Sequence, residues 1–126
     1  MSGNLNRQTF MAGETLFSEG DYADKAYLIQ EGIVEISKPN EQKQDVILAK
    51  IGRGEMIGEM ALIESNHRTA TARAVGDVTV IVVERAEFDM RMERSDPVVR
   101  QLLRIFVNRL KQTTNRKMDE SSEPRW

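Results

Sequence analysis

Residues 54–71 read GEMIGEMALIESNHRTAT, and this stretch decides what the rest of the chain is expected to build. Gly58 permits close approach of the backbone, Glu59 adds a carboxylate, and residues 60–63 favour a short helical turn. After a polar turn, Arg68 enters the next predicted strand. Free N–H groups at a helix start, placed opposite a guanidinium, make an anion site. The carboxylate suits a ligand that also donates a hydroxyl group, which describes a nucleotide better than inorganic phosphate.

On both sides of this stretch, short apolar runs are separated by Gly, Asn and Asp, a pattern typical of β-strands. The predicted strands are residues 26–30, 33–37, 46–49, 70–74 and 78–83. A tight turn at Glu31-Gly32 joins the first two, and Gly76-Asp77 separates the last two. Strands this short and this regularly punctuated favour an all-β barrel or roll over βαβ units.

The period of the apolar residues changes after Glu84. Residues 85–93 predict a short helix, and Asp96-Pro97 then forms a strong helix start, with Asp96 as N-cap and Pro97 as the first helical residue. The apolar residues beyond this start recur at helical spacing: Val99, Leu102, Leu103, Phe106 and Leu110. We expect this helix to run to about residue 117 and the tail at 119–126 to be flexible.

Composition excludes several classes of protein. The chain has 126 residues, which suits one domain, and its 40% hydrophobic residues are enough for a packed core. It has no Cys and one His, which excludes disulfide scaffolds, thiol nucleophiles and cupin-type metal enzymes. No apolar run approaches the roughly 20 residues of a membrane span, and the first residues do not form a secretory signal. We therefore expect a cytoplasmic protein that is not an enzyme and holds neither metal nor cofactor.

Charge is unevenly distributed along the chain, whose formal net charge is −2. Residues 1–96 are acidic, unlike a nucleic-acid surface, whereas residues 97–118 carry six basic residues and no acidic one. Arg100, Arg104 and Lys111 share one face of the predicted helix. Such a face is more often solvated than bound to nucleic acid, and we expect no DNA-binding domain because no helix-turn-helix follows.

The complete motif resembles the phosphate-binding cassette of the cyclic nucleotide-binding domains. In that family the cassette runs Gly-Glu-(Leu/Met)-Ala-Leu-(Ile/Leu), then a short variable turn and Arg-(Ser/Thr/Ala)-Ala-Thr. Here it stands as GEMALI at 58–63 and RTAT at 68–71. The resemblance continues through FMAGETLFSEG at 10–20, the paired strands at 27–36 and the stretch at 96–110, so it covers nearly the whole chain.

The resemblance implies a role for each residue of the cassette. Glu59 would accept a hydrogen bond from the ribose 2′-hydroxyl, and Arg68 would neutralise the cyclic phosphate with the help of backbone N–H groups. The residues implied to contact phosphate and ribose are Gly58, Glu59, Met60, Ala61, Arg68, Thr69 and Ala70. The alternative is that Glu59 and Arg68 simply form an ion pair with each other across the turn.

The base pocket is less well defined by the sequence. Alignment to the family gives Ile36 and Leu48 as apolar contacts of the base, although a plain core role is open for both. A hydroxyl at Thr69 can reach a guanine in relatives that prefer cyclic GMP, but many cyclic AMP binders also carry Ser or Thr there. The ligand is therefore expected to be cyclic AMP or cyclic GMP.

The sequence RLKQTT at 109–114 is similar to the dimer helix of bacterial members of the family. The resemblance implies that Leu110, Thr113 and Thr114 lie near the base and that two copies of the chain pair through this helix. Thr near a helix end is otherwise only a solvated residue.

The sequence as a whole predicts a mainly β fold with α-helices. An eight-stranded antiparallel β-roll, jelly-roll-like, should occupy about residues 10–84, with a short helix in the cassette and helices before and after the roll. Residues 1–118 would form the domain. Its expected function is a regulatory module that senses a cyclic nucleotide, moves its C-terminal helix and acts on an unknown effector protein. The alternative is a degenerate roll that retains the shape for protein interaction without binding nucleotide.

Overall fold

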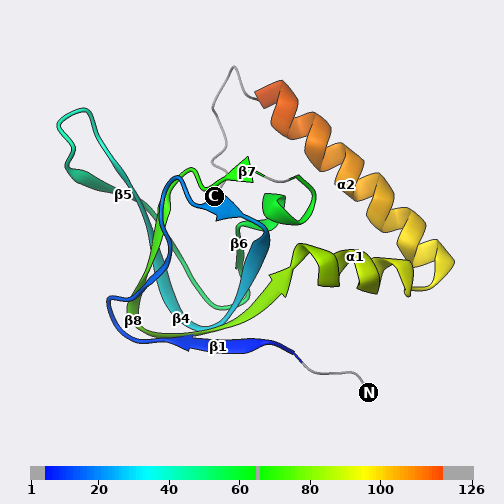
Figure 1. Cartoon of the computed structure of the whole chain (residues 1–126), viewed down its shortest axis with the longest axis horizontal. Coiled ribbons are helices and arrows are strands. Elements are labelled where there is room, and N and C mark those ends of the chain that lie inside the picture. Colours follow the sequence, from blue (N-terminus) through cyan, green and yellow to red (C-terminus); the bar gives the residue numbers. More distant parts are fainter. Residues whose placement is uncertain (1–4, 65, 118–126) are drawn as a thin grey trace. The chain divides into compact units, whose positions relative to one another are not determined.

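Two long antiparallel strands form the centre of the sheet in the computed structural model, which describes residues 5–64 and 66–117. Strand β4, Lys25–Pro39, pairs with β8, Thr71–Glu84, and the two curve side by side (Figure 1). The sheet order is β1-β8-β4-β5, with β2 beside β8 and β6 beside β4. The bounds of these outer strands are Arg7–Phe10 for β1, Thr15–Phe17 for β2, Asp45–Ile51 for β5 and Met56–Ile57 for β6. The expected antiparallel β-roll is confirmed.

The tight turn expected at Glu31-Gly32 is wrong, and so is the break at Gly76-Asp77. Both glycines lie inside continuous strands, where they have positive φ angles of 97° and 76°. The register of β4 against β8 shifts on either side of Glu31, so the glycines bend the strand pair instead of reversing the chain. A Cβ on Gly32 would lie 2.5 Å from the Asp77 carbonyl oxygen, so only glycine permits this close crossing.

The helix expected before the roll is not formed by residues 5–17. Strand β1 begins at Arg7 and pairs residue by residue with β8, from Arg7 opposite Ile81 to Phe10 opposite Val78. Pairing with the β-branched residues of β8 favours a strand in this segment over an isolated helical turn. The roll therefore starts earlier than residue 10.

The core of the roll follows the period of two that strands require. Alternate residues of β8 are buried, and they pack with side chains from β2, β4 and β6. The buried residues of this core cluster are Leu16, Phe17, Tyr27, Ile29, Val34, Ile36, Ile57, Ala70, Ala72, Ala74, Val78, Val80 and Val82.

The described residues divide into two compact units, with the boundary after Arg85. Helices α1, Arg85–Glu93, and α2, Pro97–Lys117, have the predicted bounds. The predicted N-cap is confirmed, because the Asp96 carboxylate accepts a hydrogen bond from the Val98 N–H at 2.8 Å.

Several apolar residues of α2 are exposed: Val98, Val99, Leu102, Phe106 and Leu110. No helix among the described residues is long and apolar enough to cross a membrane. The tail expected at 119–126 lies outside the described residues.

Candidate functional site

The first half of the cassette is a compact turn. Gly58 adopts a left-handed conformation with φ 77° and leads into a 3-10 helix, η1, Glu59–Leu62. The Ala61 N–H donates to the Gly58 carbonyl oxygen at 3.0 Å, and the Ile63 N–H donates to the Met60 carbonyl oxygen at 3.1 Å. Ala61 and Leu62 are buried, which anchors the turn to the roll. The expected short helix is thus present in 3-10 form.

The second half of the cassette is held by backbone hydrogen bonds on both sides of Arg68. Its N–H donates to the Asp21 carbonyl oxygen at 2.7 Å, and its carbonyl oxygen accepts from the Gly20 N–H at 2.8 Å. Just before Arg68, strand β7, Asn66–His67, pairs with β3, Tyr22–Ala23. These contacts fix the point at which Arg68 enters the core.

The Arg68 side chain is buried, with 6% of its surface exposed. Its Nη2 atom donates to the Lys25 carbonyl oxygen at 2.8 Å. The guanidinium carbon lies 4.2 Å from the centre of the Phe17 ring and 5.7 Å from that of the Tyr27 ring. Its Nε atom is buried and has no hydrogen-bond partner among the described residues. A cation is therefore held inside the roll with part of its hydrogen-bonding capacity unused.

Gly58 and Arg68 bring the two halves of the cassette together. A Cβ added to Gly58 would lie 2.5 Å from the Arg68 Nη1 atom. The guanidinium thus packs directly on the backbone at the start of η1. This is the close approach that the sequence predicted for Gly58, although its partner is a side chain of the same chain.

No acidic side chain of the described residues neutralises Arg68. The alternative in which Glu59 and Arg68 form an ion pair is not found among the described residues, where the ion pairs include Arg91 with Glu87 and Arg104 with Glu93. Burial lowers the pKa of Arg68, and the nearby Asp24 and Asp21 charges oppose that shift. Arginine nevertheless stays charged in proteins, so the site presents a cation.

The buried tyrosine beside Arg68 responds to the same environment. Burial raises the pKa of the Tyr27 hydroxyl, while the positive charge of Arg68 acts in the opposite direction. Tyr27 therefore remains a neutral phenol near neutral pH, and it adds no charge to compensate the guanidinium.

The remaining predicted site residues differ in how far their side chains are buried. In the cassette, Ala70 is buried, Thr69 is exposed and Glu59 is half-buried. Ile36 is fully buried in the core cluster, whereas Leu48 on β5 is 44% exposed, so the two do not form one apolar surface. The predicted residues of α2 belong to the second unit: Leu110 is exposed, and the side chains of Thr113 and Thr114 lie outside the described residues.

Sequence reasoning missed three groups that surround Arg68: the rings of Phe17 and Tyr27 and the Lys25 carbonyl oxygen. Tyr27 lies in the predicted strand at 26–30 and Phe17 lies in the stretch at 10–20 that carries part of the resemblance, but the sequence assigns neither of them to the site. The available signal was Arg68 itself, because an arginine that enters a buried strand without a directly bonded carboxylate needs π faces or carbonyl oxygens around it.

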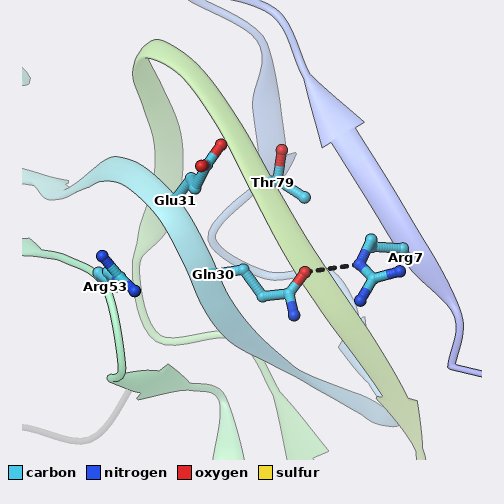
Figure 2. Close-up of a pocket in the computed structure, with 5 residues that line it drawn as sticks. All are labelled: Arg7, Gln30, Glu31, Arg53 and Thr79. Atoms are coloured by element: carbon cyan, nitrogen blue, oxygen red, sulfur yellow. Dashed lines mark hydrogen bonds between the residues drawn. The ribbon is translucent and has the colours of Figure 1, made fainter.

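A second polar pocket, open to solvent, lies on the roll and is drawn in Figure 2. Its lining residues are Arg7, Gln30, Glu31, Arg53 and Thr79. The Arg7 Nε atom donates to the Gln30 side chain at 2.7 Å, and the Glu31 carboxylate contributes negative charge. This pocket contains no residue of the cassette.

Comparison with known families assigns the class of protein that this fold and cassette define. The family model described as cyclic nucleotide-binding domain matches residues 7–95, and the chain belongs to that family. A CRP-like cAMP-activated global transcriptional regulator of Mycobacterium tuberculosis is 28% identical over 119 residues, which cover 94% of this chain and 53% of the regulator. The chain thus spans about half the length of such relatives.

Solved structures include close matches to the whole roll. The EAL enzyme Bd1971 in a half-site-occupied form is 33% identical, with a TM-score of 0.80 and coverage of 88% of this chain and 99% of that one. The Thermus thermophilus catabolite activator protein is 28% identical, with a TM-score of 0.72 and coverage of 94% and 55%. A cAMP-bound form of Bd1971 is 34% identical, with a TM-score of 0.63 and coverage of 87% of this chain and 30% of that one. A cGMP-bound form is 35% identical, with a TM-score of 0.64 and coverage of 90% and 30%. Relatives of this chain therefore include both regulators and enzymes.

Proposed function

We propose that this chain binds cyclic AMP or cyclic GMP and acts as a regulatory sensing module. The observation that carries the proposal is the Arg68 guanidinium, which is buried beside Gly58 with no acidic partner among the described residues. A buried cation without a counter-charge is costly unless a ligand or other groups compensate it. A cyclic phosphate carries one negative charge, and charge-assisted hydrogen bonds to Arg68 would supply the missing compensation.

The other cassette residues take roles around this ion pair. Glu59, which is half-buried next to Gly58, accepts a hydrogen bond from the ribose 2′-hydroxyl. Backbone N–H groups around Thr69 and Ala70 add donors for the phosphate. The Ala61 N–H contributes less than the family resemblance implied, because it already donates to the Gly58 carbonyl oxygen.

The choice of base stays open within this proposal. The EAL enzyme Bd1971 is described in both cAMP-bound and cGMP-bound forms, so similarity to it supports the class of ligand and not one base. Ile36 is enclosed in the core, which leaves Leu48 on β5 as the better candidate for apolar contact with the base.

Signalling by the module is proposed to use α2. Its exposed apolar residues, such as Leu102 and Phe106, would become covered when the helix closes over the base or pairs with the same helix of a second copy. In the closed state, Leu110, Thr113 or Thr114 would lie nearest the base. A ligand that binds one helix position better than another shifts the population toward it by its differential affinity. The effector would be a protein that distinguishes the two positions.

Isothermal titration of the full chain with cyclic AMP and cyclic GMP tests the binding proposal. Arg68→Ala should weaken binding by at least about 2 kcal/mol, near thirtyfold, because the phosphate loses its counter-charge. Arg53→Ala is a matched control, since it removes an exposed arginine from the other pocket. Binding of neither nucleotide would instead favour the degenerate roll that serves protein interaction alone. Equal affinity of Arg68→Ala and the parent would refute the phosphate site.

A further inference from the structure

The groups in direct contact with the Arg68 guanidinium that the described residues supply include no carboxylate, and the charges of Asp21 and Asp24 act on it only from a distance. The guanidinium carbon lies 4.2 Å from the centre of the Phe17 ring and 5.7 Å from that of the Tyr27 ring, and Nη2 donates to the Lys25 carbonyl oxygen at 2.8 Å. Aromatic faces attract a cation through their quadrupole, most strongly when water is excluded. The two rings and the carbonyl group, called the aromatic seat below, therefore stabilise the buried charge without neutralising it.

The aromatic seat belongs to the rigid core of the roll. Phe17 and Tyr27 are 5% and 4% exposed, and both are members of the core cluster. Their ring centres are 5.8 Å apart, and Phe10 packs edge-on against Tyr27 with its ring centre at 6.5 Å. Side chains packed in this way sit in defined rotamer minima. The Gly58 backbone restricts the guanidinium further, because a Cβ there would be 2.5 Å from Nη1.

The aromatic seat holds Arg68 without a directly bonded carboxylate that an anion would have to displace. An acidic partner would have to be displaced before a phosphate could bind, and breaking that ion pair would reduce the affinity. Ring faces and a carbonyl oxygen carry no full negative charge, and the buried Nε atom has no partner among the described residues. A cation that is fixed in place and only partly compensated is preorganised for its ligand, since little ordering remains to be done on binding.

We propose that Phe17 and Tyr27 are positioning residues that hold the Arg68 guanidinium for the ligand's phosphate. This inference rests on the proposed function and adds to it two side chains outside the cassette. Phe17 is the closer ring and should contribute more. Because the rings act through Arg68, their effect on nucleotide affinity should depend on Arg68 being present.

A double-mutant cycle separates this role from a merely structural one. Cyclic AMP is titrated into four chains: the parent, Phe17→Leu, Arg68→Ala and the double variant. Phe17→Met serves as a second variant that also lacks an aromatic face. Val80→Ala is the control, because Val80 is buried in the same core cluster but is not part of the aromatic seat. We expect Phe17→Leu to weaken binding roughly tenfold in the parent and not to weaken it in the Arg68→Ala background. The control should change affinity by the same factor in both backgrounds.

Two outcomes would overturn the proposal: equal loss of affinity from Phe17→Leu in both backgrounds, or no loss in the parent.

If the parent chain binds neither cyclic nucleotide, the proposed function fails, and the aromatic seat is then tested without ligand. The same four chains are unfolded in urea. The effect of the double variant on the folding equilibrium constant should differ from the product of the two single effects by about fivefold. Additive effects would show that no aromatic seat stabilises Arg68.

Discussion

The Arg68 guanidinium occupies the space that a side chain at residue 58 would need, since a Cβ on Gly58 would lie 2.5 Å from Nη1. Gly58 also has a φ angle of 77°, which residues with a Cβ rarely adopt. Two separate physical constraints therefore act on one position. They can be separated because Gly54 has a similar φ angle of 86°, whereas a Cβ on Gly54 would meet nothing within 4 Å beyond its chain neighbours.

Gly54→Ala should lower the free energy of unfolding by about 1 kcal/mol, the usual cost of a left-handed alanine. Gly58→Ala should lower it by at least about 1 kcal/mol more, because the added methyl group displaces the buried guanidinium. Only Gly58→Ala should also weaken binding of cyclic AMP. Urea unfolding and calorimetric titration of both variants measure these differences. Equal effects of the two substitutions would show that the contact with Arg68 has no consequence.

The proposed contact of Glu59 with the ribose predicts a specific response to a modified ligand. Glu59→Ala should weaken binding of cyclic AMP by about 1.5 kcal/mol, roughly tenfold, which is less than the loss from Arg68→Ala. The parent should lose a similar factor when 2′-deoxy cyclic AMP replaces cyclic AMP, whereas Glu59→Ala should not distinguish the two ligands. Glu64→Ala, which removes a neighbouring carboxylate, should distinguish them as the parent does. An undiminished preference for the 2′-hydroxyl in Glu59→Ala would assign that contact to another residue.

The raised pKa of Tyr27 predicts how the free energy of unfolding changes at alkaline pH. Burial raises its pKa above the ordinary value of 10.0, so the folded chain retains the phenol proton at pH values where the unfolded chain has released it. The stabilisation from this group is therefore complete below about pH 10 and is lost as the pH rises toward the folded pKa. Tyr27→Phe should reduce the decline in urea midpoint above pH 10, while Tyr22→Phe, at an exposed residue, should not. Parallel declines in the parent and Tyr27→Phe would contradict this assignment.

The cassette and the helices could be predicted from the sequence because their signals are local. The start of α2 depends on Asp96 and Pro97, which are adjacent in the chain, and the N-cap bond to Val98 follows from that order. Gly58 and Arg68 were recognised because the motif brings them together over a short segment. Such features are determined by residues that lie close together in the chain.

The bends of the long strands and the aromatic seat could not be predicted in the same way. A positive φ angle at Gly32 fits both a tight turn and a bend, and only the pairing of β4 with β8 decides between them. Likewise, Phe17 comes to Arg68 from a strand far away in the sequence. Both features depend on long-range packing, which the local pattern of apolar residues does not specify.

The proposed role of α2 predicts a change in hydrogen exchange when ligand binds. If the helix closes over the base, amides between about residues 107 and 114 should exchange more slowly in saturating cyclic AMP, because the closed position reduces local opening. The Arg68→Ala variant at the same nucleotide concentration is the control, since it should remain largely unliganded and show no slowing. Substituting Leu110→Ala should reduce both the protection and the affinity, while the exchange of amides in β4 and β8 stays as in the parent. Unchanged exchange in α2 at saturating ligand would mean that the helix does not act as a lid, and that the signal leaves the domain by another route.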